Sequence, residues 1–232
     1  MTATDLARVV LSTPTARTRT VFDAGEAVML GASPFNSFYR PATVETLVDW
    51  AAPRFEHVYV LLPGAEAAQR FIVAGMAPRQ AVRKTIVAVH QRRRAARAAL
   101  LRAGCADPDR YVLVWSRLAG NARYRTLREQ VEHAYGTVPL VRDLIRSMVT
   151  TVLSHTAGAP LSPAAIDRNV AYVFAEAPLL VDAPGVLGHQ HVLFAYHRPV
   201  PLHDLFTTGL VPGLRPVPGQ AVAQLSIEGA GA

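Results

Sequence analysis

The first residues that could carry out chemistry follow a short apolar stretch near the N-terminus. Residues 27–30 are Ala-Val-Met-Leu; Gly31 breaks the stretch and places Ser33 two residues beyond it. Because Pro34 lacks a backbone N–H and favours an extended residue before it, the strand must stop at this serine. A strand, a glycine turn and a helix form the layout in which open α/β sheets bind ligands. Ser33 is therefore a candidate nucleophile and Asn36 a candidate polar partner. The alternative is an ordinary loop whose polar side chains only satisfy backbone groups.

Two further pairs of candidate residues stand late in the chain. Tyr172 and Glu176 are four residues apart in a helical pattern, so they share one face of that helix. Apolar neighbours predict a partly buried carboxylate, which suits Glu176 to hold an ammonium group or to move a proton. Tyr196 and His197 end the last strand pattern. A core tyrosine with a surface glutamate, and a histidine that only makes hydrogen bonds, are the alternatives.

Positive charge is concentrated in one helical segment, residues 78–103. The segment carries seven arginines and one lysine and has no Asp or Glu. At about 100° per residue, four of the arginines fall within an arc of roughly 60°. An adjoining stripe of Val82, Ile86, Val89 and Leu100 could pack on a sheet. A solvated surface helix is the alternative, but such a helix normally mixes charges of both signs. The pattern favours binding of a polyanion such as a nucleic acid.

The composition describes a compact protein with a large core. Half of the 232 residues are hydrophobic, 18% are charged, and the net charge of +7 is smaller than the charge of the basic segment alone. The single cysteine, Cys105, excludes an internal disulfide and a cysteine-cluster metal site. No apolar run reaches the roughly 18 residues that span a bilayer, and residues 1–20 lack the apolar core of a secretory signal. We expect a cytoplasmic protein without a metal.

Hydrophobic patterning predicts strands that alternate with helices. The strands are expected at residues 27–30, 57–62, 111–115 and 191–196, and the helices at 43–52, 65–74, 78–103, 122–134, 140–155 and 163–178. Such alternation predicts an α/β fold with a mainly parallel sheet flanked by helices. We expect a flexible arm over residues 1–20, a single domain over 21–210, and a poorly ordered tail rich in Pro and Gly over 211–232.

Taken in chain order, the motifs are G-x-S-x-x-N-S-[FY] after the first strand, Y-x-x-x-E in a late helix and Y-H at the end of the last strand. Together with the basic helix between them, they resemble the cyclodipeptide synthases over residues 26–203. The Asn, Tyr and His are similar to those that define one subfamily. The resemblance implies a Rossmann-like domain related to class I aminoacyl-tRNA synthetases, with two aminoacyl-tRNAs as substrates and no cofactor. A P-loop, H-x-G-H and K-M-S-K-S are absent, so nothing in the sequence indicates activation by ATP.

The resemblance also implies a role for each motif residue. Ser33 would be the nucleophile that forms an aminoacyl-enzyme and then a dipeptidyl-enzyme, from which cyclisation releases a diketopiperazine. Tyr172 and Glu176 would hold the amino group of the substrate and pass protons. Three more residues would position the serine loop and the catalytic tyrosine: Asn36, Tyr196 and His197.

Two binding surfaces complete these predictions. Gly31 would let the backbone approach the substrate. Four apolar residues beside the motifs are expected to line the pocket for the side chain of the first aminoacyl group: Met29, Leu61, Leu179 and Phe194. The alternative is that all four are ordinary residues of the hydrophobic core. That side chain should be hydrophobic, because an apolar lining does not compensate the desolvation of a charge. Residues of the basic helix are expected to contact tRNA phosphates: Arg79, Arg83, Lys84, Arg93, Arg94 and Arg97. We expect a monomer.

Two other functions remain open from the sequence. A serine hydrolase or acyltransferase would use Ser33 with His197 as its base, although the sequence lacks the G-x-S-x-G elbow and this function leaves the basic helix unexplained. A non-catalytic RNA-binding or RNA-modification accessory domain explains the helix, but it leaves the combination of Ser33, Tyr172 and Glu176 unexplained.

Overall fold

A computed structural model describes residues 8–12, 15–155 and 161–228. The first part of the chain contains β1 (Arg8–Ser12), α1 (Ala16–Ala24), β2 (Ala27–Gly31), the 3-10 helix η1 (Ser37–Tyr39), α2 (Pro41–Ala51), β3 (His57–Leu62), the 3-10 helix η2 (Ala65–Ala68), α3 (Gln69–Val73) and α4 (Pro78–Arg102). The second part contains α5 (Pro108–Tyr111), β4 (Val112–Val114), α6 (Trp115–Leu118), α7 (Ala122–Thr137), α8 (Pro139–Ser154), α9 (Pro163–Glu176), α10 (Pro178–Leu187), β5 (Val192–Tyr196), α11 (Pro201–Thr207) and β6 (Gln220–Glu228).

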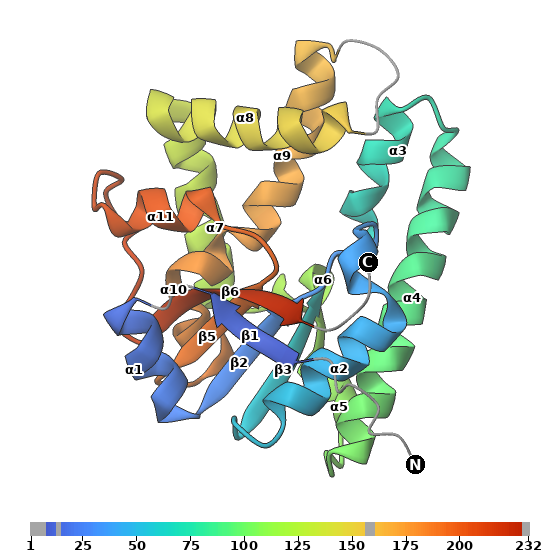
Figure 1. Ribbon diagram of the computed structural model, residues 1–232. Coiled ribbons are helices and arrows are strands. Elements are labelled where there is room, and N and C mark those ends of the chain that lie inside the picture. The colour runs from blue at the N-terminus through green and yellow to red at the C-terminus, as the bar shows by residue number, and fades with distance from the viewer. Residues whose placement is uncertain (1–7, 13–14, 156–160, 229–232) are drawn as a thin grey trace.

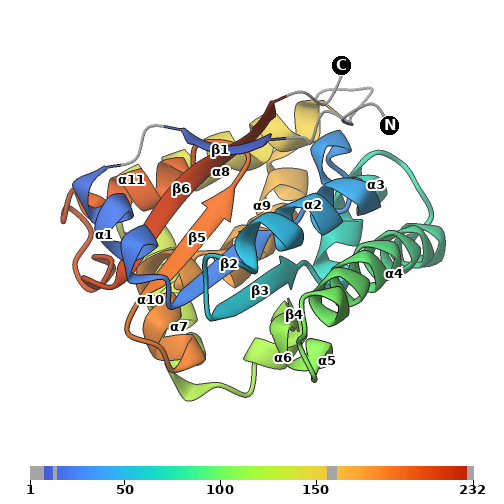
Figure 2. The same ribbon diagram turned by 60° about the horizontal axis from the view of Figure 1, so that its bottom comes forward.

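Six strands of the described chain form one sheet in the order β1-β6-β5-β2-β3-β4 (Figure 2). Neighbouring strands run parallel, except that β1 pairs antiparallel with β6. The four strands predicted from the sequence are all present, and the predicted α/β fold with a mainly parallel sheet is confirmed. β2 lies between β3 and β5, so the chain leaves it toward β3 on one side and later returns to its other side.

Helices cover both faces of the sheet (Figure 1). Successive side chains of a strand point to opposite faces, and those of β2 belong to different cores. Val28 and Leu30 pack in the core shared with α1, α2 and α4. Met29 packs in the core shared with α7, α8, α9 and α10. Because both faces are covered, the central strands are apolar throughout rather than alternating.

The basic helix α4 begins and ends as its sequence predicts. Pro78 occupies its first turn, and Gly104 follows its end with a φ of 89°. The predicted apolar stripe is only partly right: Val89 and Leu100 are buried, whereas Ile86 is 46% exposed. The buried face is formed largely by small residues. Ala95, Ala96 and Ala99 pack in the same core as α2, whereas Ala81 packs with Ala68 of η2 and Phe71 of α3.

Both ends of the described chain belong to the sheet, which corrects the prediction of a flexible arm and a poorly ordered tail. Strand β1 pairs with β6, with Leu11 opposite Leu225, and Leu225 is only 2% exposed. Residues 220–228 alternate between more and less buried positions, as a strand should. The Pro and Gly residues that precede them form the connection and conceal this pattern. Residues 1–7, 13–14 and 229–232 of these two segments lie outside the described residues.

Within the described residues, one stretch is long and apolar enough by composition to cross a membrane, Pro163–Leu187. It consists of α9 and α10, and 67% of its most apolar window is buried inside the fold. The backbone departs from helical geometry at Asp182. Packing against the sheet and its neighbouring helices therefore accounts for the apolar composition. The cytoplasmic location stays a prediction.

Candidate active site

Two adjacent strand ends bring candidate residues to one edge of the sheet. β2 and β5 are neighbours, with Leu30 opposite Ala195. The loop after β2 carries Ser33, and Tyr196 is the last residue of β5. Connections that leave two adjacent parallel strands in opposite directions open a crevice beyond the carboxyl ends of those strands. Ser33 and Tyr196 both lie at this crevice.

Helix α9 places Tyr172 over the same edge. Its N-terminus is capped by Ser162, whose side chain accepts a hydrogen bond from the backbone N–H of Ala165 at 3.2 Å. The Trp115 ring packs edge-on against the Tyr172 ring, with the centroids 4.5 Å apart. Ser33 and Tyr172 line the same cavity. Burial and the charge of Glu176 raise the pKa of the Tyr172 phenol, and Ser33 lies close enough to offset a small part of that rise.

Glu176 lies one turn after Tyr172 and faces the same cavity. Burial raises the pKa of its carboxyl to about 7. Burial, followed by the negative charge of Glu176, also raises the pKa of Tyr172 well above its usual value and raises that of Tyr196. At neutral pH, Glu176 therefore exchanges between its neutral and ionised forms, whereas the tyrosines keep their protons. Such a carboxyl can accept and return a proton, and its ionised form can hold an ammonium group.

Two distant parts of the chain, the segment after β2 and the end of β5, form a hydrogen-bond network beside Ser33. The Asn36 side-chain oxygen accepts from the backbone N–H of Phe38 at 2.9 Å, which orients its amide nitrogen toward His197. That nitrogen donates to Nε2 of His197 at 2.8 Å. Nε2 is then the unprotonated ring nitrogen, and Nδ1–H faces the Tyr39 hydroxyl at 3.2 Å. The backbone N–H of Asn36 also donates to the Ser33 carbonyl, at 3.3 Å, so this network holds the serine loop.

His197 is poorly placed to act as a base. Burial, followed by the nearby charge of Arg198, lowers the pKa of its ring to about 4, so the ring is neutral at physiological pH. Its basic nitrogen is already occupied by the Asn36 amide. A serine hydrolase would need that nitrogen to point at the Ser33 hydroxyl. The geometry indicates a positioning role for His197 instead.

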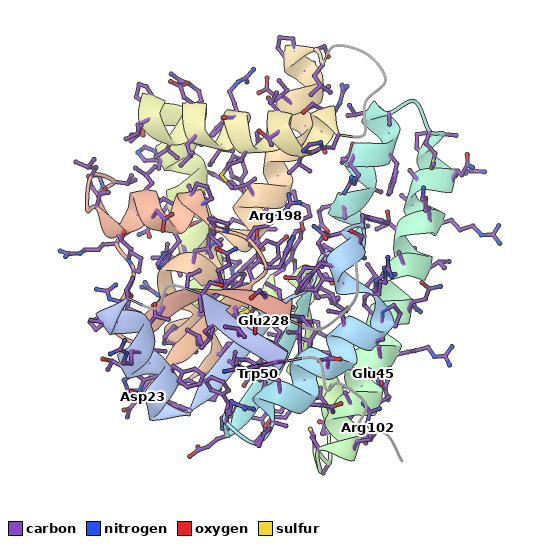
Figure 3. All side chains as sticks on the ribbon, viewed as in Figure 1. Asp23, Glu45, Trp50, Arg102, Arg198 and Glu228 are labelled. Atoms are coloured by element: carbon purple, nitrogen blue, oxygen red, sulfur yellow. The ribbon has the colours of Figure 1, made fainter. Side chains whose placement is uncertain are left out.

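A cavity of ≈ 660 Å³ lies above this edge of the sheet. The six residues predicted to be catalytic all line it: Ser33, Asn36, Tyr172, Glu176, Tyr196 and His197. Leu144, Met148 and Val152 are apolar residues that α8 contributes to the lining of the cavity. Arg198, labelled in Figure 3, follows β5 and also lines the cavity. Among the described residues, no group of three or more His, Cys, Asp or Glu side chains is arranged to hold a metal ion.

The residues predicted to bind the first side chain are mostly core residues in this structure. Phe194 lines the cavity, but Met29, Leu61 and Leu179 are absent from its wall and are almost fully buried in the same core as Phe194. A Cβ on Gly31 would lie 3.1 Å from the Tyr196 ring and 3.2 Å from the Phe194 ring. The absent side chain therefore makes room for two aromatic rings rather than for a substrate.

The cations predicted to bind tRNA fall into two groups. Four of them are exposed and make no ion pair with the described part of the chain: Arg79, Arg83, Lys84 and Arg94. Arg93 and Arg97 instead bind opposite oxygens of Asp109, at 2.8 and 2.9 Å. Further along α4, Arg102 pairs with Glu45 and Asp49 of α2 (Figure 3). The acids missing from α4 itself are thus supplied by neighbouring elements along its C-terminal half.

Sequence reasoning missed two residues of this site. Tyr39 is buried and accepts a hydrogen bond from the backbone N–H of His197 at 3.1 Å. It directly follows the N-S-F motif, so its position was a usable signal. Arg70 lines the cavity from α3. It follows the second predicted strand, at the edge of the sheet where ligands bind, but its distance from Ser33 in the sequence conceals the connection.

Comparison with known proteins agrees with this geometry. The family model for cyclodipeptide synthases matches residues 10–226. This chain belongs to the cyclodipeptide synthase family. It is therefore an enzyme of the kind that forms peptide bonds, and the predicted resemblance is confirmed. The cyclo(L-leucyl-L-leucyl) synthase of Bacillus subtilis strain 168 is 34% identical over 187 residues, which cover 78% of this chain and 75% of that protein.

Solved structures of family members share the fold. A cyclodipeptide synthase from Bacillus thermoamylovorans superposes with a TM-score of 0.86 at 24% identity, over 96% of both chains. A Mycobacterium tuberculosis protein matches with a TM-score of 0.80 at 23% identity, over 97% of this chain and 95% of that one. The latter structure relates cyclodipeptide synthetases to type I tRNA synthetases. This synthase accordingly has the Rossmann-like fold that the sequence motifs implied.

Proposed function

We propose that this synthase uses two aminoacyl-tRNAs to make a cyclic dipeptide through aminoacyl and dipeptidyl intermediates on Ser33. One observation carries the proposal: Ser33, Tyr172 and Glu176 come from distant parts of the chain and line one cavity, with Ser33 near enough to Tyr172 to influence the pKa of its phenol. A nucleophile, a proton-bearing phenol and a group that can hold an amine are the parts that this reaction needs.

In the first step, the Ser33 hydroxyl oxygen attacks the carbonyl carbon of the first aminoacyl-tRNA. The ester bond to the ribose breaks and an ester bond to Ser33 forms. The serine proton passes to the departing ribose oxygen, directly or through the Tyr172 hydroxyl. The aminoacyl ester is already activated and its leaving group is good, so neither ATP nor a full catalytic triad is required.

In the second step, the amino group of the Ser33-bound residue attacks the carbonyl carbon of the second aminoacyl-tRNA. An amide bond forms, the second tRNA leaves with a proton, and a dipeptide remains on Ser33. The new terminal amine then attacks the Ser33 ester, which closes the ring and restores the serine hydroxyl. Ionised Glu176 holds the ammonium form of the amine and accepts its proton before each attack.

The substrates are proposed to have apolar side chains. Most of the cavity wall that α8 contributes is apolar, and Phe194 of β5 adds an aromatic ring to the lining. The α8 residues are Leu144, Met148, Val149, Val152 and Leu153, together with the hydroxyl-bearing Ser147 and Thr151. An apolar wall favours side chains that lose little by leaving water. The Bacillus subtilis relative is named for a product of two leucines. Product analysis would contradict the proposal if Asp, Glu, Lys or Arg dominated both positions.

A serine hydrolase receives less support from the same residues. The Asn36 amide occupies the only basic ring nitrogen of His197. A single assay separates the candidates: the protein is incubated with charged tRNA, and the products are identified by mass spectrometry. We expect a cyclic dipeptide. Free amino acid would favour hydrolysis, and unchanged charged tRNA would favour a non-catalytic binding domain.

A further inference from the structure

Arg70 is a cavity residue for which the proposed chemistry has not yet assigned a role. It lies on α3, is partly buried and lines the same cavity as Ser33. Its guanidinium carbon stands 5.6 Å from the ring centroid of Phe35 and 5.6 Å from that of Phe71. The two rings pack edge-on, 4.6 Å apart. Contacts of this kind with aromatic rings hold a guanidinium in place.

Arg70 also continues the positive surface of α4 into the cavity. The ammonium group of Lys84 stands 4.3 Å from the Phe71 ring centroid, so Arg70 and Lys84 both contact Phe71. Arg83 precedes Lys84 and is exposed on α4. Helix α3 packs against both α4 and α9, and Figure 1 shows it between them. Arg83, Lys84 and Arg70 therefore form a series of cations from the exposed surface of α4 to the wall of the cavity that contains Ser33. Lys84 and Arg70 are linked by their contacts with Phe71.

The cavity consequently has two poles. Glu176 can carry a negative charge. Arg70 carries a positive charge near Tyr172, and this charge offsets part of the rise in the pKa of Tyr172 that burial and Glu176 cause. Glu66, one turn before Arg70, also lines the cavity, but it lies close enough to Arg128 of α7 to raise the pKa of that guanidinium, after the larger effect of Glu132. The negative charge of Glu66 therefore also interacts with the positive charge of Arg128 on α7.

The proposed substrate has a matching pair of charges. The terminal nucleotide of an aminoacyl-tRNA carries an amino group on its acyl part and a 5′-phosphate on its ribose. We infer that Arg70 binds the 5′-phosphate of the aminoacylated terminal nucleotide, while Glu176 receives the amino group. This inference rests on the proposed function. Arginine suits the task because its planar fork of N–H donors matches phosphate oxygens and because it sheds water more readily than lysine.

The experiment replaces tRNA by two small acyl donors, a 3′-aminoacyl-adenosine and the same compound with a 5′-phosphate. Acylation of the full-length protein is followed by intact-protein mass spectrometry at a series of donor concentrations. Wild-type protein should react with the phosphorylated donor at a kcat/KM higher by roughly tenfold to a hundredfold, the range expected for a charge-assisted hydrogen bond. Arg70→Ala should lose that preference, so that the ratio of its kcat/KM values for the two donors falls to about one whatever its absolute rate, and Arg70→Lys should keep part of the preference.

Arg19→Ala is the matched control, because it removes an exposed cation from α1, on another part of the surface. It should keep the wild-type preference. Equal use of both donors by the wild type, or an unchanged preference in Arg70→Ala, would overturn the inference. An equal loss with both donors would mean that Arg70 stabilises the reacting carbonyl instead. If the wild type forms no acyl-enzyme even with charged tRNA, the proposed function itself fails, so the two failures are distinguishable.

Discussion

The cavity and the outer surface of α4 treat charge in opposite ways. In the cavity, burial raises the pKa of Glu176 and lowers the pKa of His197, and both shifts favour the neutral form of the side chain. On α4, three arginines extend into water without an ion pair in the described chain: Arg79, Arg83 and Arg94. Buried groups of shifted pKa are suited to exchange protons at neutral pH, whereas exposed arginines attract phosphate from a distance. Chemistry and recognition should therefore be separable by mutation.

The largest effect is expected at the nucleophile. Ser33→Ala should lower formation of cyclic dipeptide by roughly a thousandfold or more, because no acyl-enzyme can form. Wild-type protein mixed with charged tRNA should gain the mass of one aminoacyl group, which mild base removes, and the variant should gain none. Binding of charged tRNA should persist, since α4 is unchanged. A variant that makes product at the wild-type rate would end the proposal.

Glu176→Gln should come next, with a loss of roughly a hundredfold to ten-thousandfold, the usual range for a general acid or base. It also changes the pH dependence. Because the pKa of Glu176 is raised to about 7, its ionised fraction grows as the pH passes upward through that value, so kcat/KM of the wild type should rise over the same window. The variant should lack that rise. His197 contributes none, because its pKa of about 4 lies below the window.

The exposed surface of α4 should respond to salt rather than to pH. Replacing both Arg79 and Arg83 by Glu should raise KM for charged tRNA and leave the acylation rate at saturation unchanged. If each arginine contacts one phosphate, the slope of log affinity against log salt should flatten by about two. An unchanged slope would place the tRNA elsewhere. Arg94→Ala should weaken binding more than Arg97→Ala does, because Arg97 is already paired with Asp109.

The smallest effect is expected in the network that holds the serine loop. His197→Ala should lower kcat by roughly tenfold through a misplaced loop, since a lost buried hydrogen bond costs about 1–3 kcal/mol. KM for charged tRNA and the pH dependence set by Glu176 should not change. Asn36→Ala should behave in the same way, because it breaks the same contact. A loss as severe as that of Ser33→Ala would instead make His197 a base and would favour the hydrolase.

The sequence by itself determined the parts of this protein that depend on local pattern. Apolar stretches predicted four strands, two of which end at Gly or Pro, and Pro78 and Gly104 predicted the limits of the basic helix. The short motifs around Ser33, Tyr172 and Tyr196, taken in chain order with the basic helix, produced the resemblance to the family. These features succeed because periodicity, capping and short motifs are read from neighbouring residues.

Only the tertiary structure decided the rest. Asn36 and His197 are 161 positions apart, so the tautomer of the histidine follows from a contact that no local pattern encodes. Pairing of β1 with β6 joins the two ends of the chain and turns a predicted arm and tail into strands. The pKa of Glu176 depends on how completely the carboxyl on α9 is buried. The position of Arg70 depends on the packing of α3 between α4 and α9. Burial and charge proximity arise from folding the whole chain, which is why these properties of the site appear only in three dimensions.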